Sequence, residues 1–298
     1  MTSFAYVVPS TLQATLQTLS QTDLVTQPLA GGTRLLVDLR RGAIQPDTLL
    51  DLRLLMELRQ IHLDEQAIYI GALATFSHLE SEAIIQQHIP LLAQMARSLG
   101  NPLVRRAATL GGNIASARTT ITDAVVPLLA LDAQLILQVG APATQRTVSV
   151  ADYLLQEPDS RELITWIRVP VYSPDSRSFY TKMSNRKAGA ATIASVATHI
   201  AFREKRITAA RIAVGAFASQ PFRPRRVETL LNDEALPLRA TVIDRCISLL
   251  RADLPEPLHD TVASGSYRLA MSCVLVKKAL EQIKYVDDME NVRNYPDE

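Results

Sequence analysis

Glycine is scarce in this chain, and its placement limits where the backbone can turn tightly or approach another segment closely. The sequence has 11 glycines in 298 residues, about 4% against a usual share of about 7%. Four of them stand in two pairs, Gly31-Gly32 and Gly111-Gly112. Successive glycines let backbone N–H groups converge on one anion, and a helix start adds the positive end of its dipole. Each pair therefore predicts either a tight turn or one side of a phosphate-binding site.

Length and charge balance set the class of protein to expect. At about 100–200 residues per domain, 298 residues predict two domains. Hydrophobic residues make up 47%, and 31 basic against 30 acidic side chains leave a net charge of +1. This balance is typical of a folded globular protein and argues against a nucleic-acid-binding domain, which is usually strongly basic.

The cysteine count and the apolar stretches indicate which metal centres, which cellular compartment and which membrane segments to expect. The chain has two cysteines, Cys246 and Cys273, whereas an iron–sulfur cluster or a structural zinc site needs about four ligands. We therefore expect neither, and so few cysteines fit a reducing compartment. The sequence shows no signal-peptide pattern, and its longest apolar stretch, 124–139, is too short to span a bilayer. We expect a cytoplasmic protein without a membrane span.

The first 58 residues carry the pattern of a compact βαβ unit. A capping box from Ser10 to Gln13 precedes leucines at helical spacing, which predicts a helix. A strand over 26–30 leads into the first glycine pair, and a helix over 34–41 and a strand over 48–52 follow.

The pattern changes after residue 60. Alternating apolar residues around a turn at 64–66 predict a hairpin, Thr75 is placed to cap a helix, and Pro90 suits the first turn of another. Each glycine pair follows an extended segment in this interpretation. After the second pair we expect an apolar helix near 124–131 and strands over 133–139 and 162–171.

A linker and a simpler pattern follow. Proline, serine and aspartate cluster in the segment 170–176, which predicts a linker. Strands over 178–183, 191–202 and 208–218 then precede helices near 224–231, 240–251 and 264–282. Three strands followed by three helices predict an α+β domain with helices on one face of an antiparallel sheet. The arginines at 223, 225 and 226 are expected to form a solvated helix start, with docking of an acidic partner as the alternative.

The two glycine motifs resemble those of a known family. Ala30-Gly31-Gly32-Thr33 before Leu35-Leu36, and Thr109-Leu110-Gly111-Gly112-Asn113-Ile114, look like the two flavin-pyrophosphate loops of the FAD-binding medium subunit of molybdenum hydroxylases. This is the xanthine dehydrogenase and carbon monoxide dehydrogenase flavoprotein family. Other segments match the family in order over about residues 4–283, among them Phe4-Ala5-Tyr6, Ile70-Gly71-Ala72, Lys182 with Arg186-Lys187-Ala188, Arg211–Ala216 and Ser264–Arg268.

The resemblance implies an α+β fold with two domains. An FAD-binding domain of the PCMH/vanillyl-alcohol-oxidase type would cover residues 1–175, with subdomains of about 1–58 and 59–175. A C-terminal flavoprotein domain with an antiparallel sheet and helices on one face would cover 176–285, and 286–298 would form a tail.

The resemblance also implies the FAD contacts. In the first loop they fall on Leu29, Ala30, Gly31, Gly32, Thr33, Arg34 and Leu35, and in the second on Thr109, Gly111, Gly112 and Asn113. Outside the loops they fall on Leu99, Asp123, Ile164 and Lys182. The loops are expected to bind pyrophosphate through backbone N–H groups, Asp123 to accept hydrogen bonds from flavin or sugar, and Lys182 to favour the anionic reduced flavin. We expect no catalytic residue and no metal ligand in this chain.

By the same resemblance the chain works inside a complex. A large molybdenum-cofactor subunit would oxidise the organic substrate, and a [2Fe-2S] iron–sulfur subunit would pass the electrons to FAD. FAD would then reduce NAD+ or another acceptor. Since this chain lacks cluster ligands of its own, a partner must supply the cluster.

Departures from the family pattern keep alternatives open. Arg34 stands where the family often has an acid, and the stretch Ser116–Asp123 lacks a usual Ser-Pro and reaches its acid one residue late. A degenerate scaffold that binds flavin weakly or not at all is one alternative. A self-contained flavin reductase is another, although the sequence offers no convincing acid–base pair for it. The five histidines are scattered, and we expect none to pair with a carboxylate one helical turn away.

Overall fold

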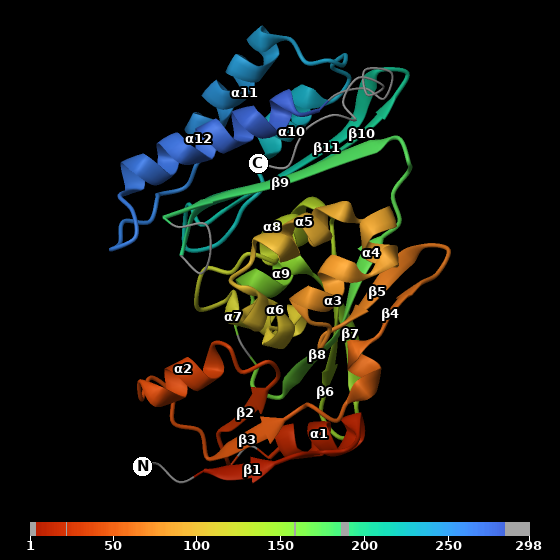
Figure 1. The fold of residues 1–298 in the computed structure, drawn as a ribbon, viewed down its shortest axis with the longest axis vertical. Coiled ribbons are helices and arrows are strands. Elements are labelled where there is room, and N and C mark those ends of the chain that lie inside the picture. The colour runs from red at the N-terminus through yellow and green to blue at the C-terminus, as the bar shows by residue number, and fades with distance from the viewer. Residues whose placement is uncertain (1–3, 22, 158, 186–190, 284–298) are drawn as a thin grey trace. The chain divides into compact units, whose positions relative to one another are not determined.

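The computed structural model describes residues 4–21, 23–157, 159–185 and 191–283 (Figure 1). Two compact units divide the chain: an N-terminal unit of residues 1–128 and 132–171, and a C-terminal unit of 129–131 and 172–298. Apart from the short segment 129–131, the chain passes from the first unit to the second at Val171–Tyr172, inside the segment that the sequence indicates as a linker. The expected tail and the Arg186-Lys187-Ala188 motif lie outside the described residues.

A small parallel sheet begins the N-terminal unit. Strands β1 (Ala5–Val7), β2 (Thr26–Leu29) and β3 (Thr48–Asp51) lie in the order β1-β3-β2, and both outer strands run parallel to β3. Helices α1 (Leu12–Leu19) and α2 (Leu35–Arg40) connect them, as the βαβ pattern predicts. The capping box was placed one residue too early, because Thr11 has the extended backbone that an N-cap needs and its hydroxyl accepts the Ala14 N–H at 3.2 Å.

Leucines hold this part of the unit together. Leu16 and Leu19 of α1, both at most 3% exposed, share a core cluster with Leu50 of β3. Trp166 packs against the same cluster. Each buried leucine contributes roughly 1.5–3 kcal/mol, so apolar burial accounts for the attachment of α1 to the sheet.

A five-stranded antiparallel sheet forms the rest of the N-terminal unit. Its order is β4-β5-β8-β6-β7, with every neighbouring pair antiparallel. The strands are β4 (Ile61–Leu63), β5 (Ala67–Gly71), β6 (Gln134–Val139), β7 (Thr144–Ser149) and β8 (Glu162–Pro170). The hairpin and the strands β6 and β8 were predicted. Strand β7 was not, since its mainly polar sequence becomes a strand only by pairing with β6 at the sheet edge.

Short helices accompany this sheet. They are α3 (Phe76–Ser81), α4 (Ala83–His88), α5 (Pro90–Ser98), α6 (Pro102–Ala107), α7 (Leu110–Ser116), α8 (Val125–Ala130) and α9 (Val150–Leu155), with a 3-10 turn at Met56–Arg59 before β4. Thr75 caps α3 and Pro90 begins α5, as predicted. The second glycine pair lies inside α7, and only Ala108 and Thr109 separate α7 from α6. Both residues have extended backbone and Thr109 forms an isolated bridge with Thr75, so the extended segment expected before the pair is short.

The C-terminal unit confirms the predicted order of three strands and then three helices. Strands β9 (Ser176–Ser184), β10 (Thr192–Arg203) and β11 (Arg206–Gly215) form an antiparallel sheet, and α10 (Arg225–Leu231), α11 (Ala240–Asp253) and α12 (Gly265–Glu281) follow. Figure 1 shows these helices on one side of the sheet. Alternate residues of β10, such as Val196 and Ile200, share one core cluster with Cys246 and Val276 of the helices. Both cysteines are buried and free.

The arginine cluster before α10 is not simply solvated. Arg223 is buried, and its Nε lies 2.7 Å from Oε1 of Glu228, which is itself 6% exposed. Arg225 and Arg226 are exposed and pair with Glu228 and Asp253. The expectation of a solvated helix start was therefore wrong for Arg223, because a carboxylate one turn into the helix draws it inward.

Candidate functional site

The first glycine pair lies in the connection between β2 and α2. Gly32 has a φ of +68°, a left-handed conformation that glycine adopts without steric cost. Among the described residues, no group accepts a hydrogen bond from the backbone N–H groups of residues 30–34. These N–H groups follow the carboxyl end of a parallel strand, where α/β folds usually bind ligands. The connection therefore offers a run of free donors suited to an anion such as a phosphate.

Gly31 brings this connection against the end of α6. A Cβ atom on residue 31 would lie 2.0 Å from the carbonyl oxygen of Ala107 and 3.0 Å from Cα of Ala108. No side chain fits at those distances, so glycine is required by close backbone approach. Ala107 and Ala108 were not among the predicted site residues, because nothing in the local sequence signals a contact with so distant a segment.

The second glycine pair is built differently. The N–H groups of Leu110 and Gly111 donate to the carbonyls of Ala74 and Ala72 at 2.9 and 2.8 Å. A Cβ on residue 111 would lie 2.6 Å from Cβ of Ala72, so Gly111 lets α7 pack on the chain after β5. The N–H of Gly112 donates to the capping hydroxyl of Thr109 at 3.3 Å. The donors of the second loop are thus mostly engaged, and the free donors belong to the first loop.

Gly112 is where the two loops meet. A Cβ on residue 112 would lie 3.8 Å from Cβ of Ala30, and beyond the Thr109 hydroxyl it would meet no other atom within 4 Å. The structure therefore brings the two predicted loops together within one unit. A glycine without a side chain, close to a run of free N–H groups, suits a pyrophosphate, with the first loop supplying the hydrogen bonds.

Asn113 and the stretch before α8 lie beside the second loop. The side-chain oxygen of Asn113 accepts the Ala124 N–H at 3.1 Å, so Asp123, the preceding residue, is held near α7. Arg118 anchors the middle of the stretch, since its guanidinium lies 3.7 Å from the centre of the Tyr153 ring and its Nε donates to the Tyr153 carbonyl. The stretch Ser116–Asp123 is therefore held to the N-terminal unit at Arg118 and, at its end, by the hydrogen bond from Ala124 to Asn113.

The remaining predicted contacts lie elsewhere. Leu99 follows α5 and Ile164 lies in β8, and both are more than nine-tenths buried. Their side chains would line the floor of a site more readily than its opening. Lys182 lies in β9, opposite Ser195, in the C-terminal unit. Its contribution to a flavin site stays a prediction.

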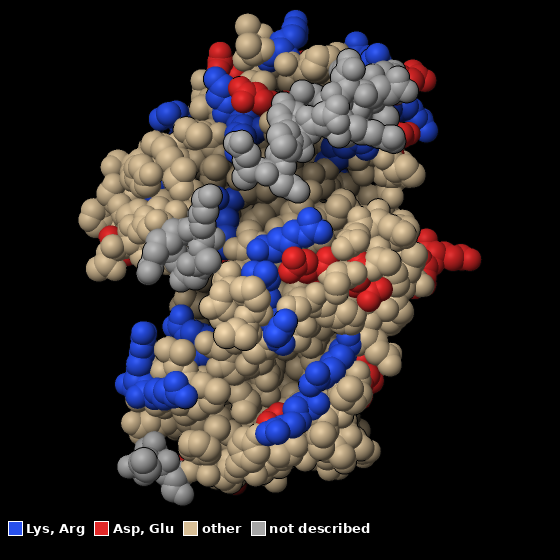
Figure 2. Space-filling view, viewed as in Figure 1, with Lys and Arg blue, Asp and Glu red and all other residues tan. Residues whose placement is uncertain are grey.

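Arginines gather around α2. Arg34 precedes the helix, Arg40 ends it and Arg41 follows it, and Figure 2 shows the basic side chains over this helix. The Nε of Arg34 lies 2.6 Å from Oδ2 of Asp38, and its Nη1 lies 3.5 Å from the Thr120 hydroxyl. Basic side chains beside a run of N–H groups raise the local positive potential, which favours a bound anion.

Neither a metal site nor a membrane span emerges from the described part of the chain. No group of three or more His, Cys, Asp or Glu side chains within it is arranged to hold a metal ion. His78 does pair with a carboxylate one turn away, as its Nε2 lies 3.1 Å from Oε2 of Glu82, so the contrary expectation was wrong. None of the helices that the structure describes is both long and apolar enough to cross a bilayer.

Comparison with known proteins identifies the family. A model described as "FAD binding domain in molybdopterin dehydrogenase" matches residues 2–172, and one described as "CO dehydrogenase flavoprotein C-terminal domain" matches residues 179–283. The chain therefore belongs to the FAD-binding subunits of the molybdenum hydroxylases, a family of oxidoreductase flavoproteins. The family that the sequence resembles and the α+β fold that it implied are confirmed.

Individual relatives agree over nearly the whole chain. The glyceraldehyde dehydrogenase medium chain of Sulfolobus acidocaldarius is 31% identical, over 94% of this chain and 98% of that protein. The nicotinate dehydrogenase FAD-subunit of Eubacterium barkeri is 27% identical, over 88% and 87%. A chain of carbon monoxide dehydrogenase from Hydrogenophaga pseudoflava, solved without the Mo-pyranopterin moiety of its cofactor, superimposes with a TM-score of 0.86 and 26% identity, covering 93% and 96%.

Proposed function

We propose that this chain binds FAD at its two glycine loops and passes electrons from a [2Fe-2S] iron–sulfur subunit through FAD to NAD+ or another acceptor. The observation that carries the proposal is the first loop, where the N–H groups of residues 30–34 have no acceptor among the described residues. In an FAD-binding family, such a run of donors facing an open glycine is best explained by the cofactor's pyrophosphate.

Each loop residue has a defined task in this proposal. The N–H groups of residues 31–33 donate to pyrophosphate oxygens, and Arg34 adds positive charge beside them. Gly112 leaves room for the phosphates, while the Thr109 hydroxyl holds the Gly112 N–H and keeps the first turn of α7 in shape. FAD supplies the redox chemistry when bound, and the protein supplies its orientation and electrostatic environment. As the resemblance implies, Asp123 would accept hydrogen bonds from the flavin or the sugar. Lys182 would favour the anionic reduced flavin.

The proposed partners are the subunits that would carry the other redox centres of such a complex. A large molybdenum-cofactor subunit would oxidise the substrate, and an iron–sulfur subunit would deliver the electrons to this chain in the cytoplasm. The relative from Sulfolobus is named a medium chain, which supports a place between larger and smaller subunits. The sequence has two cysteines, fewer than the four or so ligands that an iron–sulfur cluster needs, so a partner would carry the iron–sulfur centre.

The visible spectrum of the purified full-length chain tests cofactor binding. We expect a flavin spectrum, with FAD released on denaturation at about one per chain. A colourless protein that stays colourless after incubation with FAD would overturn the proposal. That result would favour the scaffold alternative, for which the altered stretch before Asp123 is the reason.

A second experiment tests the electron acceptor. NADH added without oxygen should bleach the bound flavin if NAD+ is the acceptor, because the transfer is reversible. A flavin that stays oxidised with NADH but is bleached by a reduced quinone would assign a different acceptor and overturn the NAD+ part of the proposal.

A further inference from the structure

Helix α6 lies between three parts of the candidate flavin site but has no apolar anchor of its own. None of its residues is buried, and Leu103 is 73% exposed. Most helices are held in place by an apolar face packed against a core. The Phe76 N–H donates to the Ala108 carbonyl at 3.1 Å and holds the end of α6, and polar side-chain contacts help to fix the rest of the helix.

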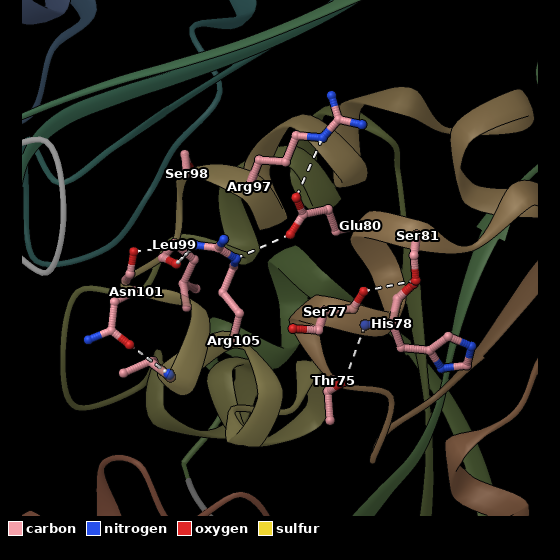
Figure 3. Close-up of polar contacts among 12 residues, drawn as sticks. Thr75, Ser77, His78, Glu80, Ser81, Arg97, Ser98, Leu99, Asn101 and Arg105 are labelled. Carbon is pink, nitrogen blue, oxygen red and sulfur yellow. Dashed lines mark hydrogen bonds and ion pairs between the residues drawn. The ribbon is translucent and has the colours of Figure 1, made fainter.

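Arg105 provides those contacts from the middle of the helix. Its side chain is 17% exposed, and its Nε lies 3.2 Å from Oε2 of Glu80 in α3. Its Nη1 donates to the carbonyls of Leu99 and Gly100 at 3.3 and 3.5 Å. Figure 3 shows Arg105 reaching both Glu80 and the turn before its own helix. A planar guanidinium can bind both sides at once, which an ammonium group cannot do equally well.

Both ends of α6 adjoin predicted flavin contacts. Before it comes the turn of Leu99 and Gly100, where Gly100 has a φ of +50° and the Asn101 side chain caps the helix by accepting the Val104 N–H at 2.9 Å. At its other end, the carbonyl of Ala107 lies against Gly31, and Thr109 follows to begin the second loop. A shift of α6 would therefore move three things together: the Ala107 backbone on which Gly31 packs, the start of the second loop at Thr109, and the Leu99 turn.

We propose that Glu80 and Arg105 form a positioning pair that sets the geometry of the flavin site through α6. The inference rests on the proposed function, because the affected residues matter only if FAD binds there. Neither side chain needs to touch the cofactor. Glu80 acts through Arg105, and Arg105 acts through the backbone of α6.

FAD titration of the purified full-length chain tests the pair. Arg105→Met removes both sets of hydrogen bonds and should weaken FAD binding by about tenfold or more. Glu80→Gln keeps an acceptor but loses the charge, so its effect should be smaller. Arg105→Lys should recover part of the affinity lost in Arg105→Met. The visible circular dichroism of the bound flavin should change in both Arg105→Met and Glu80→Gln, since it reports the surroundings of the ring.

Two matched variants serve as controls. Glu82→Gln changes a neighbouring glutamate that pairs with His78 instead of α6. Arg97→Met removes the other arginine near Glu80, which is 61% exposed and 3.9 Å away. Both should bind FAD as the wild type does. In the Arg105→Met background, Glu80→Gln should have no further effect if Glu80 acts only through Arg105.

The outcomes separate this inference from the proposed function. If the wild type binds no FAD, the proposed function fails first. If the wild type binds FAD and Glu80→Gln and a folded Arg105→Met keep wild-type affinity and circular dichroism, the positioning pair is wrong and the flavin site stands. If Arg105→Met does not fold, Glu80→Gln and Arg105→Lys decide the question by the same two measurements.

Discussion

At the scale of single residues, one carbonyl oxygen explains why residue 31 is glycine. The Ala107 carbonyl would lie 2.0 Å from a Cβ there, far inside contact distance, whereas Gly42 has φ +68° but nothing within 4 Å of its own missing Cβ. The two glycines thus have different requirements: residue 31 needs space and residue 42 needs a left-handed backbone.

Gly31→Ala should therefore weaken FAD binding by roughly tenfold or more, because the first loop must move off α6 to admit the methyl group. Gly42→Ala is the control, since it should cost about 1–2 kcal/mol of stability through its backbone conformation and leave FAD affinity unchanged. Fluorescence titration with FAD measures both. Equal affinity in wild type and Gly31→Ala would contradict the structural account of the loop.

Asp51 is a second residue whose environment the structure defines. It is 4% exposed, and the Tyr6 hydroxyl and the Arg53 backbone and side chain donate to its carboxylate. Burial by itself would raise the pKa of Asp51, but these hydrogen bonds outweigh it and hold the pKa below the ordinary value. The charged form is therefore the one that stabilises the fold.

Asp51→Asn should lower the free energy of unfolding by about 1–3 kcal/mol near neutral pH. A carboxylate with a depressed pKa contributes fully above the unfolded pKa of about 3.9 and loses its contribution as the pH falls through the folded pKa. The difference between wild type and variant should thus be constant from about pH 7 to pH 5 and shrink below about pH 4. Urea titrations across this range measure it, and a difference that grows in acid would contradict the assignment.

At the scale of elements, α10 shows how one carboxylate can join a helix to a sheet. Glu228 accepts the Ile212 N–H of β11 at 2.8 Å and the Arg223 Nε at 2.7 Å, and Arg225 reaches its other oxygen at 3.1 Å. Arg223 and Glu228 are both at least nine-tenths buried as side chains. A buried pair of this kind is costly to break from one side, because the remaining charge is left without a partner.

Glu228→Gln should therefore destabilise the protein by about 2–4 kcal/mol. Arg225→Met, which removes an arginine whose side chain is 68% exposed, should cost below about 1 kcal/mol. Chemical denaturation followed by far-ultraviolet circular dichroism compares the two. Similar losses in both variants would show that burial does not distinguish the two arginines.

At the scale of the whole molecule, each unit has an apolar core, but the two units differ in what they carry besides it. The C-terminal unit has a broad apolar core shared by its sheet and three helices. The N-terminal unit carries the loops, where close backbone contacts and unpaired N–H groups replace apolar packing. A ligand that binds only the folded loops should thus stabilise the N-terminal unit most.

FAD at about one hundred times its dissociation constant should stabilise the folded state by about 2.7 kcal/mol. We expect the thermal transition to rise with FAD concentration in the wild type and much less in Gly31→Ala. Differential scanning calorimetry of the full chain measures the shift and shows whether one or two transitions respond. An unchanged transition in the wild type would contradict specific binding to the native loops.

The sequence predicted most elements, and the two glycine loops that it singled out lie close together in the structure. Helix and strand periodicity, Thr75 and Pro90 located the regular elements, since these signals are local. Strand β7 was missed because its polar residues become a strand only beside β6. Ser10 was preferred over Thr11 as a cap because both residue types suit that position, and the backbone conformation decides between them.

By itself the sequence determined the two-unit α+β architecture, the glycine loops and, through their motif, the flavoprotein family, because these depend on residue type and spacing along the chain. Only the tertiary structure decided that the first loop holds the free N–H groups while those of the second are engaged by Ala72 and Ala74. It also decided that Gly31 lies against Ala107 and that Arg105 links α6 to Glu80. Such contacts join segments distant in sequence, and their partners are chosen by packing and hydrogen-bond geometry, which no local pattern encodes.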